Sequence, residues 1–557
     1  MTGLLLQPTI PAEDTPVPLL LSPARPRTRR VTAGLTAGLL AAAVVAGPGP
    51  AVAAPKPLPL DLSTAGVAEV QAGLAARSFT SETLTQAYLD RIQALNIDGP
   101  HLNSVRSINP SALAEAKALD QERKKGTVRG PLHGVPVLVK DNIDVAGMPT
   151  TAGSVALANS YPAADAPLVT ELRKAGAIII GKTNLTEFAN FMTSGMPAGY
   201  SSLGGQVLNP YDASQTPSGS SAGSGSAGAA GLATLTIGTE TSGSILSPAR
   251  ANSLVGVKPT VGIASRTGII PISATQDTAG PMTRSVYDAA ALLTAMTSID
   301  PEDPATAANP SDDVDFTGAL SDTALEGQRL GYVASTTDPV YTAALDELRA
   351  QGATLVPVTV GGSAAPSILT LEFERDLNAY LARLPEDAPM DTLSDIIAYN
   401  TANAPAALKF GQTLLTASEA VDLDDPAQQA QYVAARDTGL AESRAAIDTV
   451  LTTNDLDAIV SNSATVGVGA RAGYPSVIVP SGYTEANRRP SGVVFLGTAW
   501  SEEDLLGFAY DFEQAVKAWQ SPQNLNPSLF RCTSVVPATE WDASCTTTAV
   551  KPGKGRK

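Results

Sequence analysis

Helical segments alternate with short apolar runs along most of this chain, and no other feature of the sequence limits its fold as strongly. Leu84, Tyr88 and Leu95 recur at helical spacing after a polar start. Residues 135–139 alternate valine with other residues, as a strand does, and this predicted strand ends at Lys140. Helices that alternate with buried strands predict an α/β layered core.

A further helix and strand are predicted for residues 165–180. Asp165 is expected to cap the helix, Pro167 favours its first turn and Gly176 is expected to end it. The apolar residues 177–180 then form a buried strand. Residues 176–183 also fit the phosphate-loop pattern letter by letter, but we reject that interpretation because the order of elements is wrong. A phosphate loop needs a strand, then a loop, then a helix.

The composition excludes several kinds of function. The 557 residues include 37 Lys and Arg against 54 Asp and Glu, a net charge of −17, which argues against a nucleic-acid partner. Only two histidines and two cysteines occur, so neither a metal site, a cofactor nor a Ser-His-Asp triad is expected. His133 is interpreted as a structural residue in the turn before the strand that ends at Lys140.

The amino end is typical of a secretion signal. Arg25, Arg27, Arg29 and Arg30 precede an apolar run at 31–47, and small residues follow at 51–54. The run has the length of a signal core, about 15 residues, and is shorter than the roughly 20 that cross a bilayer. We therefore expect residues 1–54 to be removed and the protein to be secreted, without stable membrane association. An uncleaved anchor is the alternative.

One large domain is predicted for residues 55–530, with a variable helical portion near 285–447. No repeat and no long linker divides the chain. Residues 531–557 are expected to form a tail. For an exported protein, a disulfide between Cys532 and Cys545 is expected to pin this tail, and two free thiols are the alternative.

Small residues dominate the stretch 217–281, which is the most informative part of the sequence. It contains Gly-Ser-Ser at 219–221 and Gly-Thr-Glu-Thr-Ser-Gly-Ser-Ile at 238–245. A flexible linker is the simplest interpretation, but interleaved apolar residues such as Leu232, Leu235 and Ile237 favour close packing in a buried helix and strand. A turn of small residues can also direct several N–H groups at an anion, as an oxyanion hole requires.

At these residues the sequence resembles the amidase signature family. The family's catalytic lysine corresponds to Lys140 in the segment 130–142, its bridging serine to Ser220, and its nucleophile to Ser244. The resemblance also implies a cis peptide bond between Gly219 and Ser220. It extends over about residues 62–519 and is strongest to bacterial peptide amidases. It implies a single α/β domain whose central mixed β-sheet of many strands is covered by helices on both faces.

The resemblance also implies how the missing imidazole is replaced. Neutral Lys140 would accept a proton from Ser220, which would accept one from Ser244 as the latter attacks a carboxamide. Backbone amides of Thr241, Ser242, Gly243 and Ser244 would stabilise the oxyanion. Two alternatives concern neighbouring residues: Asp141 could pair with Lys140 and raise its pKa, and Ser221 or Ser224 could be mistaken for the bridging serine.

The expected function is therefore hydrolysis of amides by a secreted enzyme. Peptides that end in a C-terminal carboxamide are the first choice of substrate, and aliphatic or aryl amides come next. The family's commonest Gly-Gly-Ser is Ser242-Gly243-Ser244 here, and its usual arginine is Leu246, so the shape of the acyl pocket is left open. The other hypotheses are a non-catalytic secreted binding protein and one component of a glutaminyl amidotransferase. The protein is expected to act as a monomer.

Overall fold

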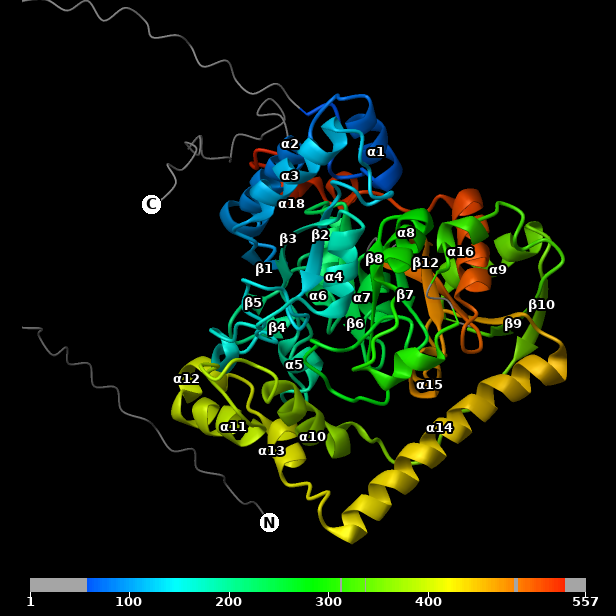
Figure 1. Cartoon of the computed structure of the whole chain (residues 1–557). Helices are drawn as coiled ribbons and strands as arrows, with labels where there is room; N and C mark the ends of the chain where they lie inside the picture. The colour runs from blue at the N-terminus through cyan, green and yellow to red at the C-terminus, as the bar shows by residue number, and fades with distance from the viewer. Residues whose placement is uncertain (1–57, 311–312, 336, 485–488, 536–557) are drawn as a thin grey trace, which may run out of the picture. The chain divides into compact units, whose positions relative to one another are not determined.

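An eleven-stranded mixed sheet forms the centre of the molecule (Figure 1). The computed structural model describes residues 58–310, 313–335, 337–484 and 489–535. The strand order is β1-β3-β2-β6-β8-β7-β12-β13-β11-β9-β10. The bounds are β1 Val105–Ile108, β2 Pro136–Lys140, β3 Ile178–Thr183, β6 Leu235–Glu240, β7 Val255–Lys258, β8 Thr278–Thr283, β9 Arg329–Val333, β10 Thr354–Val358, β11 Ala458–Ser461, β12 Ser476–Tyr483 and β13 Pro490–Leu496, with β4 Tyr200–Ser201 and β5 Gly205–Gln206 in a separate pair.

Helices cover both faces of this sheet. Helices α6 and α7 lie on one face, where Ala249 of α7 packs against Gly256 and Ile478. Helices α8 and α16 lie on the other face, against Val257 and Phe495. The helices are α1 Val67–Ala75, α2 Ser81–Ile92, α3 Ala112–Lys124, α4 Pro167–Lys174, α5 Glu187–Asn190, α6 Ala222–Ala229, α7 Leu246–Ala251, α8 Val286–Met296, α9 Pro339–Ala350, α10 Leu369–Leu381, α11 Leu393–Ala402, α12 Ala404–Ala407, α13 Thr413–Glu419, α14 Pro426–Asn454, α15 Val466–Ala472, α16 Glu502–Val516, α17 Pro522–Leu525 and α18 Pro527–Phe530. The predicted α/β core is confirmed.

The elements predicted around Lys140 are present. Helix α2 begins after Thr80, whose side chain accepts a hydrogen bond from the Thr83 amide. Strand β2 is buried at every position and ends at Lys140. Strand β3 fills the positions of the rejected phosphate-loop pattern and is buried throughout, which supports that rejection.

The expected cap of the helix at 167–174 is wrong. Helix α4 begins after Ala166 instead of Asp165, and no side chain caps it. The reason is Pro167, because a residue before proline is held in an extended conformation and Ala166 therefore becomes the first flanking residue. The Asp165 carboxylate accepts a hydrogen bond from the Ala146 amide at 2.8 Å and forms an ion pair with Arg173 at 2.9 Å.

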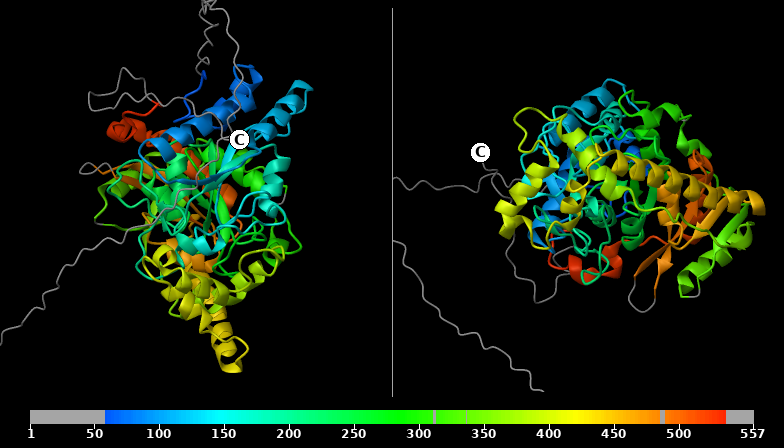
Figure 2. Two further views of the ribbon diagram at one scale, coloured as in Figure 1. Left: turned by 90° about the vertical axis from the view of Figure 1, so that its left-hand side faces the viewer. Right: turned by 90° about the horizontal axis from the view of Figure 1, so that it is seen from below.

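The portion near 285–447 is less purely helical than predicted. It contains β9 and β10, which pair in parallel at one end of the sheet. Most of their residues are only half-buried, so the apolar pattern that marks a buried strand is weak there. The rest consists mainly of helices. One of them, α14, has 29 residues and is seen lengthwise in the view from below (Figure 2).

Two predictions concern residues outside the described ranges. The secretion signal at 1–54 lies wholly outside them, and of the predicted disulfide only Cys532 lies inside. Among the described residues, no helix is both long and apolar enough to cross a membrane.

Candidate active site

Lys140 and Ser220 meet where the carboxyl end of β2 faces the amino end of α6. Lys140 Nζ lies 2.8 Å from Ser220 Oγ, and both side chains are fully buried. The same nitrogen donates to Thr239 on the neighbouring parallel strand β6, at 2.8 Å to Oγ1 and 3.3 Å to the carbonyl oxygen. The peptide bond between Gly219 and Ser220 is cis, as the resemblance to the amidase signature family implies.

The surroundings of Lys140 favour its neutral form. Burial lowers the pKa of Lys140 to about 7, and the carboxylates of Asp277 and Glu240 oppose this shift. All three hydrogen-bonding atoms around its nitrogen are uncharged oxygens. A lysine with this pKa is largely deprotonated just above neutral pH and can accept a proton from a serine hydroxyl.

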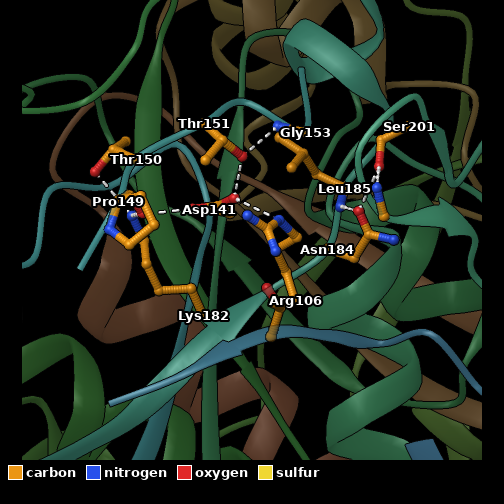
Figure 3. A network of polar contacts seen from close by, with 12 residues as sticks. Arg106, Asp141, Pro149, Thr150, Thr151, Gly153, Lys182, Asn184, Leu185 and Ser201 are labelled. Carbon is orange, nitrogen blue, oxygen red and sulfur yellow. Dashed lines mark hydrogen bonds and ion pairs between the residues drawn. The ribbon is translucent and has the colours of Figure 1, made fainter. Parts of the chain in front are cut away.

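Asp141 does not pair with Lys140. Its Oδ1 lies 3.0 Å from the nitrogen of Lys182 on β3, and both of these side chains are fully buried (Figure 3). Throughout the described ranges, Lys140 forms no ion pair with any carboxylate. The alternative in which Asp141 keeps Lys140 charged is therefore not supported.

Of the three serines near the start of α6, only Ser220 contacts Lys140. Ser221 Oγ donates to the carbonyl oxygen of Thr239 at 3.1 Å. Ser224 Oγ donates to the carbonyl oxygen of Ile237 at 2.8 Å. Both of these hydroxyls thus bind backbone of β6, and of the three serines Ser220 is the one that is hydrogen-bonded to Lys140.

Ser244 lies in a turn that Glu240 braces. Glu240 Oε2 accepts hydrogen bonds from the amides of Ile245 and Leu246 at 2.8 and 3.0 Å. The Ser221 amide donates to the carbonyl oxygen of Ser244 at 3.2 Å, which brings the two serine-bearing segments side by side. Ser244 itself is buried, with 8% of its surface exposed.

The turn before Ser244 has the form that an oxyanion hole requires. Within the described part of the chain, the amides of Ser242, Gly243 and Ser244 donate to no protein acceptor. Gly243 has a φ of +83°, which a residue with a side chain would adopt only at a cost. Successive free amides in such a turn can converge on an anion.

Two residues of the segment before β8 hold Thr241 in place. Its hydroxyl donates to Asp277 Oδ1, and its carbonyl oxygen accepts from Gln276 Nε2 at 3.1 Å. Burial raises the pKa of Asp277 to about 6, while the hydrogen bond from Thr241 and two backbone amides act in the opposite direction. These contacts hold the amino side of the turn, as Glu240 holds its carboxyl side.

Two cavities flank these residues. The larger, about 380 Å³, reaches Thr239 and Thr241, and one of its walls is the apolar segment 269–272. The smaller, about 160 Å³, is lined by Ser218 and Ser247, which flank the two serines. Neither lining includes Ser220 or Ser244. Because the larger cavity reaches Thr241, which precedes the free amides of the turn, and has an apolar wall, we regard it as the better candidate for the organic part of a substrate.

Several residues of the site carried no predicted role. Thr239, Glu240, Gln276 and Asp277 lie within quoted motifs, but their contacts were not foreseen. The one available signal is that Lys140 and Thr239 both lie at the carboxyl ends of parallel strands, where polar side chains of α/β proteins gather.

His133 contacts backbone groups outside these motifs. His133 is buried, and its Nε2 lies 3.0 Å from the Leu119 carbonyl oxygen, away from the serines. In the described ranges no three side chains of His, Cys, Asp or Glu are grouped as a metal site would need.

Many known proteins are similar to this chain. The sequence profile of the family described as Amidase matches residues 83–466. A probable amidase of Arabidopsis thaliana is 38% identical over 484 residues, which cover 83% of this chain and 92% of that protein. The solved structure of the native peptide amidase of Stenotrophomonas maltophilia matches with a TM-score of 0.78 and 43% identity, over 84% of this chain and 99% of that one.

In sequence, a second group of relatives covers less of the chain. One component of the glutamyl-tRNA(Gln) amidotransferase of Anaeromyxobacter dehalogenans is 40% identical over 308 residues, 54% of this chain and 61% of that protein. The profile match and the full-length similarity to amidases, together with the buried Lys140–Ser220 contact, lead to one conclusion: this chain belongs to the amidase signature family and is an amidase, a hydrolase of amide bonds.

Proposed function

We propose that this protein is an exported serine amidohydrolase that acts as a monomer and converts the C-terminal carboxamide of peptides to a carboxylate and ammonia. The observation that carries the proposal is the fully buried contact of 2.8 Å between Lys140 and Ser220, next to the turn that bears Ser244. A peptide amidase is also among the solved structures that the chain resembles over most of its length.

In the first half of the proposed reaction, Ser244 is the nucleophile. Neutral Lys140 accepts the proton of Ser220, which accepts the proton of Ser244 as its Oγ attacks the carboxamide carbon. The free amides of Ser242, Gly243 and Ser244 bind the oxyanion that forms. Ser220 then returns a proton to the departing nitrogen, and ammonia leaves an ester on Ser244.

In the second half, water replaces ammonia. Ser220, backed by Lys140, accepts a proton from the water as it attacks the ester carbon. The carboxylate product leaves when Ser244 recovers its proton, which restores the starting state. Within the protein, these three side chains are the groups that gain or lose protons, and the acid that forms gives its proton to ammonia or solvent.

The larger cavity supports a peptide as substrate. Ile269, Ile270 and Ile272 offer apolar surface to a side chain, and charged residues, among them Arg266 and Arg383, line other parts of the cavity. A cavity of about 380 Å³ can hold one or two residues of a peptide and is large for a short aliphatic amide. A general aliphatic or aryl amidase is the second candidate.

Two other hypotheses receive less support. In sequence, the amidotransferase components match only about half of this chain, whereas the probable amidase of Arabidopsis thaliana matches more than four fifths of it. A non-catalytic binding protein would not need a buried lysine with a pKa near neutrality beside a serine.

The test is ammonia release by the mature protein from amidated peptides, free aliphatic amides and glutamine. Peptide amides are expected to give the highest kcat/KM, and Ser244→Ala is expected to abolish turnover while a peptide amide still binds. Activity limited to aliphatic amides would refute the peptide specificity. Full activity of Ser244→Ala would refute its role as nucleophile.

A further inference from the structure

Two lysines lie on neighbouring parallel strands but on opposite faces of the sheet. In the register of β2 and β3, Val139 is opposite Lys182 and Lys140 is opposite Thr183. Side chains alternate along a strand, so Lys182 shares a face with Val139 and Asp141, while Lys140 points to the other face. The step from Lys140 to Asp141 therefore separates an amine from a carboxylate that the sequence places side by side.

The contacts of Lys182 are those of a charged ammonium group. Its nitrogen donates to the Pro149 carbonyl oxygen at 2.9 Å and to Thr150 Oγ1 at 2.8 Å, and it forms the ion pair with Asp141 at 3.0 Å (Figure 3). The two hydrogen bonds and the ion pair surround the nitrogen with three oxygens, one of them anionic. Lys140 contacts uncharged oxygens only.

The second carboxylate oxygen of Asp141, Oδ2, is also held in place. It accepts a hydrogen bond from the Thr151 hydroxyl, and Arg106 Nε of β1 lies 3.8 Å from the same oxygen. The backbone of Asp141 continues the strand, with its amide donating to the Thr183 carbonyl oxygen at 3.0 Å. The carboxylate is thus fixed by groups from β1, β3 and the loop at 149–151, none of which touches Ser220.

We propose that Lys182 is a positioning residue for the amidase reaction: it holds the Asp141 carboxylate on the face of the sheet away from Lys140 and balances its charge, so that Lys140 remains an uncharged base. This inference rests on the proposed function of Lys140. Its physical basis is that an unbalanced buried carboxylate near an amine favours the protonated amine, which cannot accept a proton from Ser220.

Other charged groups lie near Lys140 and near the Asp141–Lys182 pair, and they limit which residues can be substituted in a test. Asp277 and Glu240 face Lys140, but they also hold the oxyanion turn, so changing them would alter more than charge. Around the Asp141–Lys182 pair lie Arg106 on β1, Asp144 in the loop after β2 and Tyr380 on α10. The pair itself can be changed without removing any contact of Ser220 or Ser244.

The test is the pH dependence of kcat/KM, whose acidic limb is expected to follow deprotonation of Lys140 near pH 7. Lys182→Met leaves a carboxylate without its partner, so the limb is expected to move to higher pH by about half to one unit. Asp141→Asn leaves a cation without its partner, so the limb is expected to move to lower pH by a similar amount. The double variant removes both charges, and its limb is expected to return to the wild-type position.

Two further variants keep the test decisive. Arg106→Gln removes only the more distant, partly exposed cation, so this variant is expected to fold and to move the limb slightly to higher pH. Lys174→Met removes an ion pair of the same kind from the surface, with Glu171, and is expected to leave the profile unchanged.

The result that would overturn the inference is a loss of kcat in Lys182→Met and Asp141→Asn without a shift of the limb, or with shifts in the same direction. If neither of these variants folds, an unmoved limb in Arg106→Gln would also overturn it. Lys140→Ala tests the proposed function separately: full activity in that variant would refute the role of Lys140 whatever the other variants do.

Discussion

At the scale of single residues, burial alone does not decide what a lysine does in this protein. Lys140 and Lys182 are both fully buried, and burial lowers the pKa of each. Lys182 has a carboxylate at 3.0 Å, whereas Lys140 has two hydroxyls and a carbonyl oxygen. The partner therefore distinguishes a structural cation from a candidate base.

The lowered pKa of Lys140 has a consequence for stability. Between pH 7 and about 10.5 the unfolded chain binds a proton at this lysine that the folded chain does not, so this lysine makes the free energy of unfolding rise with pH across that window. One proton corresponds to a slope of about 1.4 kcal/mol per pH unit. Lys140→Met is expected to lower the slope by about this amount, as measured by chemical denaturation at pH 7.5, 8.5 and 9.5. An unchanged slope would show that Lys140 is charged in the folded protein.

At the scale of elements, helix α6 depends on small residues because it packs against backbone. A Cβ atom on Gly223 would lie 2.2 Å from the Asn184 carbonyl oxygen and 2.5 Å from that of Ser104. Neither backbone oxygen can move aside as the end of a side chain could. The glycines of the stretch at 217–231 therefore let α6 approach closely enough to place Ser220 against Lys140.

This packing predicts opposite effects for two substitutions in helices. Gly223→Ala is expected to lower the free energy of unfolding by about 3 kcal/mol and to reduce activity, because α6 must shift. Gly467→Ala in α15 is the matched control, since no atom lies within 4 Å of the added Cβ; it is expected to be neutral or to stabilise by up to about 1 kcal/mol. Equal effects in thermal or chemical denaturation would contradict the packing of α6.

The turn that bears Ser244 is a second such element, and Glu240 holds its carboxyl side. Glu240→Ala removes the acceptor for the amides of Ile245 and Leu246, so we expect kcat to fall by about 100-fold with little change in KM. Glu171→Ala, which removes a surface carboxylate paired with Lys174, should leave both constants unchanged. A rise in KM alone in Glu240→Ala would show that Glu240 serves substrate binding and not the turn.

At the scale of the whole molecule, the net negative charge favours the approach of positively charged peptides. The chain carries a net charge of −17. The carboxylates of Glu302, Asp303 and Asp376 at the larger cavity are paired with arginines, so the negative field arises from the rest of the molecule. Such a field attracts cations and is screened by salt within about 10 Å at 0.1 M ionic strength.

The corresponding prediction concerns salt. For a peptide amide with a free amino group and a lysine side chain, kcat/KM is expected to fall by about threefold or more between 10 and 500 mM salt. For the acetylated, uncharged peptide amide of the same length, it is expected to stay constant. Parallel behaviour of the two substrates would mean that the acidic charge plays no part in substrate choice.

Much of this site could be predicted because its signals are local. The alternation at 135–139 placed Lys140 at the end of a buried strand, and the order of three motifs identified the serines through a family resemblance. The same local rules failed in two places. Pro167 moved the start of α4 away from Asp165, and the half-buried strands β9 and β10 lacked the apolar pattern of a core strand.

The sequence by itself determined the α/β class, the strand that carries Lys140 and the family, because strand periodicity and motif order depend on residues close together in the chain. Only the tertiary structure decided which charges are paired. Asp141 is adjacent to Lys140 in sequence yet bonds to Lys182, and Asp277 holds Thr241 from 36 residues away. Such pairs depend on strand register and on which face a side chain leaves, and long-range packing sets both.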